Sequence, residues 1–163
     1  MLHEANYQYK SDQQNEYFCT MKHLLHNPVY HALTSGDRHL SFGTDDVKYF
    51  DEQVSPFVGF AEGYTEGFNE LYELLPPGRR ILYASPELMP GPAGWLLKHE
   101  IKGLQFVYES FNEIKNEFTN VFPLGEDHIG QMVHLASITK PGPFGQRTIG
   151  FGNYFGIFEQ EEL

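Results

Sequence analysis

Cysteine, basic residues and long apolar runs are all scarce in this sequence of 163 residues. The single cysteine, Cys19, excludes an intramolecular disulfide and a cysteine-rich zinc site, and it is typical of a reducing cytoplasm. Eleven Lys and Arg against 22 Asp and Glu give a net charge of −11, and the basic residues do not cluster, so no nucleic-acid partner is expected. No run of about 18 apolar residues and no signal-peptide pattern occurs, which predicts a soluble, cytoplasmic protein without a membrane partner.

Apolar and aromatic residues are plentiful by contrast. Hydrophobic types make up 40% of the chain, with 14 Phe and 10 Tyr, which suffices for a large core and excludes global disorder. The length suits one domain or two small units that share a core. We expect a flexible leader over residues 1–20, an accessory α/β unit over 21–112 and a second unit over 113–163, with the polar stretch 110–117 as the linker.

Apolar spacing and turn residues predict helices and strands in alternation. Helices are expected from Asn27 to a stop at Gly36, over 68–75, over 129–136 and over 146–152. Strands are expected over 40–42, 47–50, 56–61, 80–84, 95–98, 104–109, 121–124 and 154–158. This order, with several hairpin-like neighbours, indicates an α/β (α+β) fold with a mixed, mostly antiparallel sheet flanked by helices.

Eight histidines invite a metal hypothesis, with His23, His26, His31 and His39 gathered in the first third of the chain. No HExxH pattern is present, and no carboxylate or cysteine completes a tetrahedral set at helical spacing. Solvated or capped histidines are therefore the favoured interpretation, and we assign no metal ligand. A metal-dependent enzyme stays as a third hypothesis, which zinc analysis would test.

Glycines recur every fourth residue at Gly59, Gly63 and Gly67, each followed by an aromatic residue. The order is not that of a phosphate-binding loop, and no GxxxxGK[ST] occurs. Turn, cap and packing roles, with Thr65 as a cap, are favoured over a ligand loop.

Several aromatic residues could floor a pocket or pack in the core: Tyr83, Trp95, Phe106 and Tyr108. Core burial is the expectation, because each ring removes a large apolar area from water. Hydrolase chemistry has no support, because no serine lies in a GxSxG turn and Cys19 has no nearby base.

Two prolines and two glycines make the stretch 137–148 a rigid, tightly turning loop after a helix. The loop would carry Lys140, Phe144, Arg147 and Thr148 outward. Composition alone leaves a ligand-binding loop and a plain helix stop equally supported.

Residues 135–157, LASITKPGPFGQRTIGFGNYFGI, resemble a motif of a bacterial branch of the GNAT acyltransferase superfamily, L-T-x-P-G-P-F-x-x-R-T-x-x-x-G-x-Y-x-G-I. The stretch HNPVYHALTSGDRHL at 26–40, the LPPG at 75–78 and the Gly94-Trp95 pair are similar to the N-terminal half of that branch. The resemblance covers about residues 21–163 and is strongest at 139–157.

The resemblance implies transfer of an acetyl group from acetyl-CoA to the amine of a small molecule or peptide. The first strand, two helices and second strand of the GNAT fold would correspond to 121–124, 127–136, 146–152 and 154–158. The loop would then border the acceptor pocket and supply the substrate-binding residues Lys140, Pro141, Gly142, Pro143, Phe144, Arg147 and Thr148.

The acetyl-CoA site is the point of departure from the family. GNAT proteins carry a Q/R-x-x-G-x-G/A turn that opens a helix and cradles the pyrophosphate, and we expect this sequence to have none. The chain would stop at Leu163 before the donor site, so we assign no catalytic or cofactor-binding residue. We expect a chain that does not bind acetyl-CoA tightly, is inactive alone, and self-associates through an unpaired sheet edge at 154–158. The alternative is a non-catalytic ligand-binding or interaction module.

Overall fold

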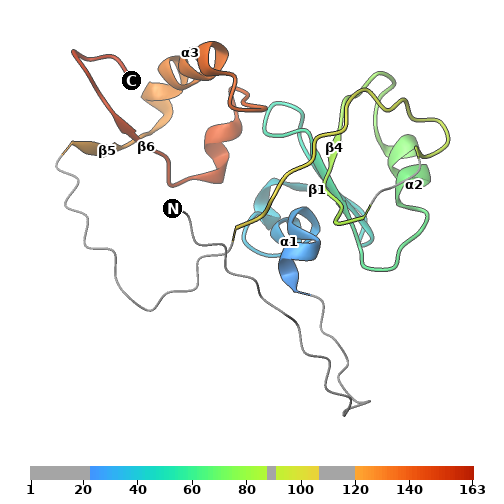
Figure 1. Cartoon of the computed structure of the whole chain (residues 1–163). Coiled ribbons are helices and arrows are strands. Elements are labelled where there is room, and N and C mark those ends of the chain that lie inside the picture. The colour runs from blue at the N-terminus through green and yellow to red at the C-terminus, as the bar shows by residue number, and fades with distance from the viewer. Residues whose placement is uncertain (1–22, 88–90, 107–119) are drawn as a thin grey trace, which may run out of the picture.

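The computed structural model describes residues 23–87, 91–106 and 120–163. The expected leader 1–20, the linker 110–117 and Tyr108 lie outside the described residues. The elements, with η for 3-10 helices, are η1 Leu24–His26, α1 Pro28–Thr34, η2 Arg38–Leu40, β1 Ser41–Gly43, β2 Val47–Phe50, β3 Phe57–Phe60, α2 Gly67–Leu74, β4 Leu82–Tyr83, β5 Val121–Pro123, η3 Glu126–His128, α3 Ile129–Thr139, η4 Thr148–Phe151 and β6 Phe155–Ile157 (Figure 1).

Two sheets organise the described residues. The first has the order β1-β2-β3-β4, in which β1, β2 and β3 are antiparallel neighbours and β4 runs parallel to β3 after the crossover through α2. The second consists of β5 and β6 in antiparallel pairing. The predicted mixed, mostly antiparallel sheet flanked by helices is confirmed.

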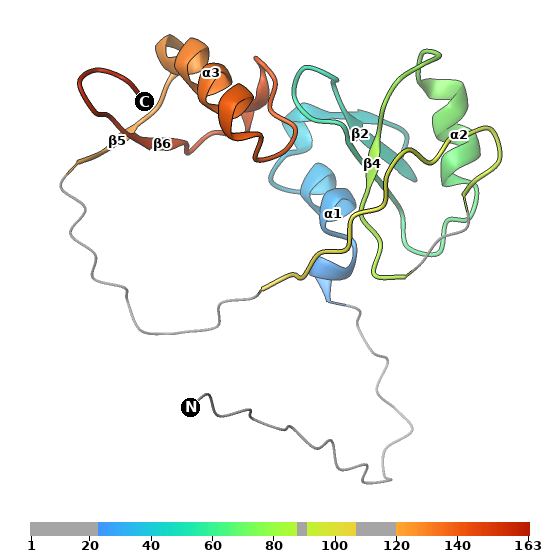
Figure 2. The same ribbon diagram turned by 45° about the horizontal axis from the view of Figure 1, so that its top comes forward.

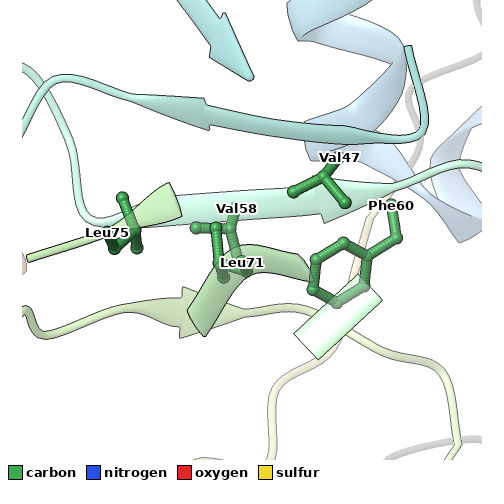
Figure 3. Packing of buried hydrophobic residues seen from close by; sticks show 5 residues of the cluster. All are labelled: Val47, Val58, Phe60, Leu71 and Leu75. Atoms are coloured by element: carbon green, nitrogen blue, oxygen red, sulfur yellow. The ribbon is translucent and has the colours of Figure 1, made fainter. Parts of the chain in front are cut away.

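One face of the first sheet carries the larger core cluster. In the β2–β3 register Val47 lies opposite Phe60, and Val58 lies opposite Tyr49, so these side chains share a face. Helix α2 covers that face with the fully buried Leu71 (Figure 3). Burial of an aliphatic side chain of this size contributes about 1.5–3 kcal/mol, which makes this cluster a main source of stability.

Helix α1 covers the opposite face. Leu33 is fully buried there and clusters with Phe50 and Val54. Gly59 permits the approach, because a Cβ atom at that position would lie 2.5 Å from the backbone nitrogen of Tyr30. The packing interpretation of the glycine rhythm is therefore confirmed at Gly59.

The other two glycines have separate reasons. Gly63 has φ of +76° in a turn, and a Cβ atom at Gly67 would lie within 2.7 Å of the Phe60 ring. The predicted cap is wrong, because Glu66 rather than Thr65 occupies the N-cap position of α2, and no side chain there caps the helix.

No strand forms over residues 95–98 or 104–106, the described parts of the strands expected over 95–98 and 104–109, and residues 107–109 lie outside the described residues. Residues 95–106 have no strand pairing, and most of their apolar side chains face solvent. The exposed set is Leu96, Leu97, Ile101, Leu104 and Phe106, with Phe106 the most exposed. Alternating apolar residues form a strand only where a neighbour supplies hydrogen-bond partners, and here none does so among the described residues.

Trp95 and Tyr83 are half-buried and pack against the core cluster, which agrees in part with the predicted burial, whereas Phe106 is exposed. Trp95 packs against the α2 cluster, and its indole Nε1 donates a hydrogen bond to the Phe68 carbonyl at 3.0 Å. Burial raises the pKa of the Tyr83 hydroxyl. No helix in the described residues has the length and apolar character that crossing a bilayer requires.

Candidate functional site

Helix α3 ends in the turn that starts the predicted loop. Lys140 adopts the left-handed conformation with φ of 49°, and its amide donates to the Ala136 carbonyl, which closes the helix. Gly142 follows with φ of 148°, a value at which a side chain is disfavoured. Lys140, Pro141 and Gly142 are all exposed.

The second half of the loop is anchored on the connection between β2 and β3. The Thr148 hydroxyl is buried, donates to the Val54 carbonyl at 2.8 Å and accepts from the Gly145 amide at 2.7 Å. The Arg147 amide donates to the Gln53 carbonyl at 3.1 Å. A Cβ atom at Gly145 would lie 2.4 Å from that same carbonyl oxygen, so only glycine fits.

Side-chain contacts extend this junction. The Arg147 guanidinium lies 3.2 Å from the Asp51 carboxylate, although both groups are partly exposed and the pair contributes little energy. Phe151 packs edge-on against Phe50 with ring centroids 5.2 Å apart. These contacts hold together chain segments that are about a hundred residues apart. Figure 2 shows the segment that follows α3 next to the first sheet.

A cavity of about 230 Å³ lies at this junction. It is lined by Glu52, Val54, Ser55, Pro56, Arg80, Pro143, Phe144 and Gly145. The lining combines apolar walls with one acidic and one basic side chain, a pattern that suits a small polar ligand with an apolar part.

A nearly buried arginine holds the acidic side of this cavity. Arg79 has 9% of its side chain exposed, donates from Nη2 to the Phe50 carbonyl at 3.1 Å and lies 3.6 Å from Glu52. Its Nε atom has no hydrogen-bond partner among the described residues. The Glu52 side chain is 62% exposed, so its carboxylate stays accessible to a ligand.

The structure separates the seven predicted binding residues into three groups. Pro143 and Phe144 line the cavity, whereas Thr148 is buried with its hydroxyl fully used. Arg147 and the exposed Lys140, Pro141 and Gly142 are not among the lining residues. Phe144 packs edge-on against Tyr154 at 6.0 Å, and burial raises the pKa of the Tyr154 hydroxyl.

Sequence reasoning missed the cavity residues that come from the first sheet. Glu52 and Ser55 lie in a short strand connection, and Arg80 follows a Pro-Gly turn. None of them belongs to a motif. They lie beside the loop because contacts between distant segments hold it there, among them the hydrogen bond between Thr148 and Val54, 94 positions apart.

The prediction that this sequence has no R-x-x-G-x-G run is wrong. Residues 147–152, RTIGFG, have that spacing. They form η4 and then lead into β6, so no helix opens at this point. The amides of residues 147, 148, 150 and 152 all donate to protein carbonyls, which leaves no open set of amides for a pyrophosphate.

The histidines of the described residues do not take part in a metal-binding group. Among residues 23–87, 91–106 and 120–163, no group of three or more His, Cys, Asp or Glu side chains is arranged to hold a metal ion. His23 instead accepts a hydrogen bond from the Leu25 amide at the start of η1, and His39 lies 3.4 Å from the Gly150 carbonyl.

No protein-family model and no curated protein matches this chain. Among solved structures, the chain is similar to a protein from Novosphingobium aromaticivorans that is assigned to the GNAT family of acetyltransferases, with a TM-score of 0.66 and 23% sequence identity. The similarity covers 87% of this chain and 62% of that chain, so this chain spans less than two thirds of the neighbour's length. The fold is thus GNAT-like, as the resemblance of residues 135–157 implied.

Proposed function

We propose that this chain forms the acceptor side of a GNAT-type N-acetyltransferase, which moves an acetyl group from acetyl-CoA to the amine of a small molecule or peptide. One observation carries the proposal: within a GNAT-like fold, the 140–148 loop borders a cavity that also holds the Glu52 carboxylate. A carboxylate attracts an ammonium group, and Phe144 supplies an apolar wall for the rest of the acceptor.

The reaction sets clear demands on the acceptor. The amine nitrogen bonds to the thioester carbonyl carbon, the C–S bond breaks, and coenzyme A leaves as the thiol with the proton that the amine gives up. An amine held by Glu52 arrives protonated and must lose a proton before it attacks. We assign no described residue as the base.

The donor side is proposed to be missing from this chain. The amides of the RTIGFG run are used inside the protein, and α3 is preceded by Glu126 and Asp127, which disfavour an anionic pyrophosphate at its N-terminus. We therefore propose that the chain alone neither binds acetyl-CoA tightly nor acetylates. The same observation favours the second candidate, a module that binds the acceptor without chemistry.

Binding of primary amines by the full chain tests the acceptor half. Glu52→Gln and Phe144→Ala are each expected to weaken binding of a small arylalkylamine about five- to tenfold in a calorimetric titration. Glu73→Gln and Phe42→Ala, which change exposed residues outside the cavity, are the matched controls. Unchanged affinity in Glu52→Gln would contradict the proposed site.

Thermal shift and thiol release test the donor half. A protein that binds acetyl-CoA gains about 2.7 kcal/mol at a hundredfold excess over its dissociation constant, whereas we expect no shift for this chain. Amine-dependent thiol release from acetyl-CoA would show that a donor site exists and would decide for the enzyme. Amine binding without thiol release would support the binding module.

We also propose self-association in the cytoplasm. Among the described residues, the sheet of β5 and β6 has two strands, and Phe155 and Ile157 are each more than half exposed, so this face and its edges favour pairing with a second copy. Sedimentation equilibrium should show a dimer, and Phe155→Lys should reduce it to a monomer. A monomer at all concentrations in the wild type would contradict this part of the proposal.

A further inference from the structure

An open groove of about 800 Å³ lies apart from the cavity, where η3 and the start of α3 face the ends of β5 and β6. It is lined by Phe122, Pro123, Asp127, His128, Gln131, Phe158 and Glu161. No lysine or arginine is among these residues. The groove is therefore an apolar surface with a negative rim.

Two phenyl rings and an imidazole form its aromatic wall. Phe122 lies opposite Gly156 in the β5–β6 register, so Phe158, two residues further on, shares its face. The rings of Phe122 and Phe158 pack at 6.2 Å and 64°, and the His128 ring lies 5.5 Å from Phe158. Phe122 is 51% exposed, which leaves aromatic surface accessible to a ligand.

The polar groups of the groove are mostly committed to the protein. Gln131 donates from Nε2 to the Glu161 carbonyl at 3.2 Å and accepts at Oε1 from the Leu163 amide at 3.1 Å. His128 accepts at Nδ1 from the Gly125 amide at 3.0 Å, which places the proton of the neutral ring on Nε2. The carboxylates of Asp127 and Glu161 have no hydrogen bond or ion pair with another described residue.

The two carboxylates have different explanations. Asp127 lies just before α3, where a negative charge complements the helix dipole. Glu161 belongs to the tail that turns back after β6 toward α3 (Figures 1 and 2), where its carbonyl accepts the hydrogen bond from Gln131. Gln160 and Glu161 have φ of 51° and 71° in a tight turn between Glu159 and Glu162, a conformation that favours Asn and Gly. Local preference therefore does not account for a glutamate at this position.

We propose that this groove binds a quaternary ammonium group of an organic ligand. Aromatic faces attract a cation whose charge is spread over methyl groups, and the carboxylates of Asp127 and Glu161 in the lining add long-range attraction. A primary ammonium group would need several directed acceptors, and the amide of Gln131 is already used. An anion would meet only negative side chains and the single Nε2 proton of His128. The site is independent of the proposed acetyl transfer, because a quaternary nitrogen has no N–H to exchange for an acetyl group.

Titration of the full chain with choline, followed by amide chemical shifts, tests the proposal. The neutral isostere 3,3-dimethyl-1-butanol has the same shape without the charge and is expected to bind at least about fivefold more weakly. Phe158→Leu, which keeps apolar volume but removes the aromatic face, and Glu161→Gln are each expected to weaken choline binding about three- to tenfold. Glu126→Gln is the matched control, since Glu126 neighbours the groove without lining it.

Equal binding of choline and its neutral isostere would overturn the proposal, and so would unchanged affinity in Glu161→Gln. The absence of shifts around Phe122 and His128 at tens of millimolar choline would also overturn it. Glu161→Gln alters an exposed tail residue, so the test holds even if Phe158→Leu does not fold. Glu52→Gln should leave choline binding unchanged, which separates a failure here from a failure of the acceptor site.

Discussion

Thr148→Val removes one hydroxyl from the junction between the loop and the first sheet. The side chain is 5% exposed, and its Oγ1 makes hydrogen bonds with the Val54 carbonyl and the Gly145 amide. Valine has nearly the same shape, so no large cavity forms and the loss is that of the two hydrogen bonds. Each buried group left without a partner costs about 1–3 kcal/mol, and water can reach the partly exposed Gly145 amide. We expect the free energy of unfolding to fall by about 2–4 kcal/mol.

Urea unfolding followed by both far-UV circular dichroism and Trp95 fluorescence measures this loss. The two probes should shift together if the junction unfolds with the first sheet, because Trp95 reports on the α2 cluster. Thr139→Val is the control, since its hydroxyl is exposed and bonds only to the Leu135 carbonyl within α3. A loss below about 0.5 kcal/mol, or one equal to that of the control, would refute the assigned role of Thr148.

Three further outcomes follow from packing and charge. In urea unfolding, Gly59→Ala should lower the free energy of unfolding by about 3 kcal/mol or more, because the new Cβ would overlap the α1 backbone. Gly36→Ala is the control: the space around Gly36 is open, so the free energy of unfolding should change by less than about 1 kcal/mol. Trp95→Phe should cost about 1–3 kcal/mol in the same assay, because the Phe68 carbonyl loses its donor. Hydrogen bonds from the Thr44 and Tyr64 hydroxyls lower the pKa of the Glu70 carboxyl from its usual 4.5. The difference in stability between wild type and Glu70→Gln should therefore be present at pH 6 and shrink as the pH falls below about 4.5. A difference that grows toward low pH would contradict this sign.

Local chemistry explains why much of the fold could be predicted. Pro28 at the first position of α1, the apolar stripe of α2 and the Pro-Pro-Gly stop after it mark elements that the structure contains. The glycine rhythm indicated close packing, and Gly59 provides it against α1. These features depend on residues a few positions apart, where steric and propensity effects act directly.

The candidate site could be predicted only in part. Composition and the GNAT resemblance pointed to the 140–148 loop, and Pro143 and Phe144 do line the cavity. Glu52 and Arg80 carried no signal, because their role depends on a contact made across the fold. The RTIGFG spacing alone would have suggested a pyrophosphate turn, yet its amides are used within the protein.

The sequence by itself determined the mixed α/β class, the positions of α1, α2 and α3, and the turning loop after α3, because hydrophobic period, proline and glycine act over short distances. Tertiary structure decided that residues 95–106 have no strand partner among the described residues, that Thr148 is an anchor, and that aromatic and acidic side chains from separate segments line one open groove. The physical reason is that pairing, burial and charge complementarity are properties of contacts between distant segments, and spacing along one segment does not specify them.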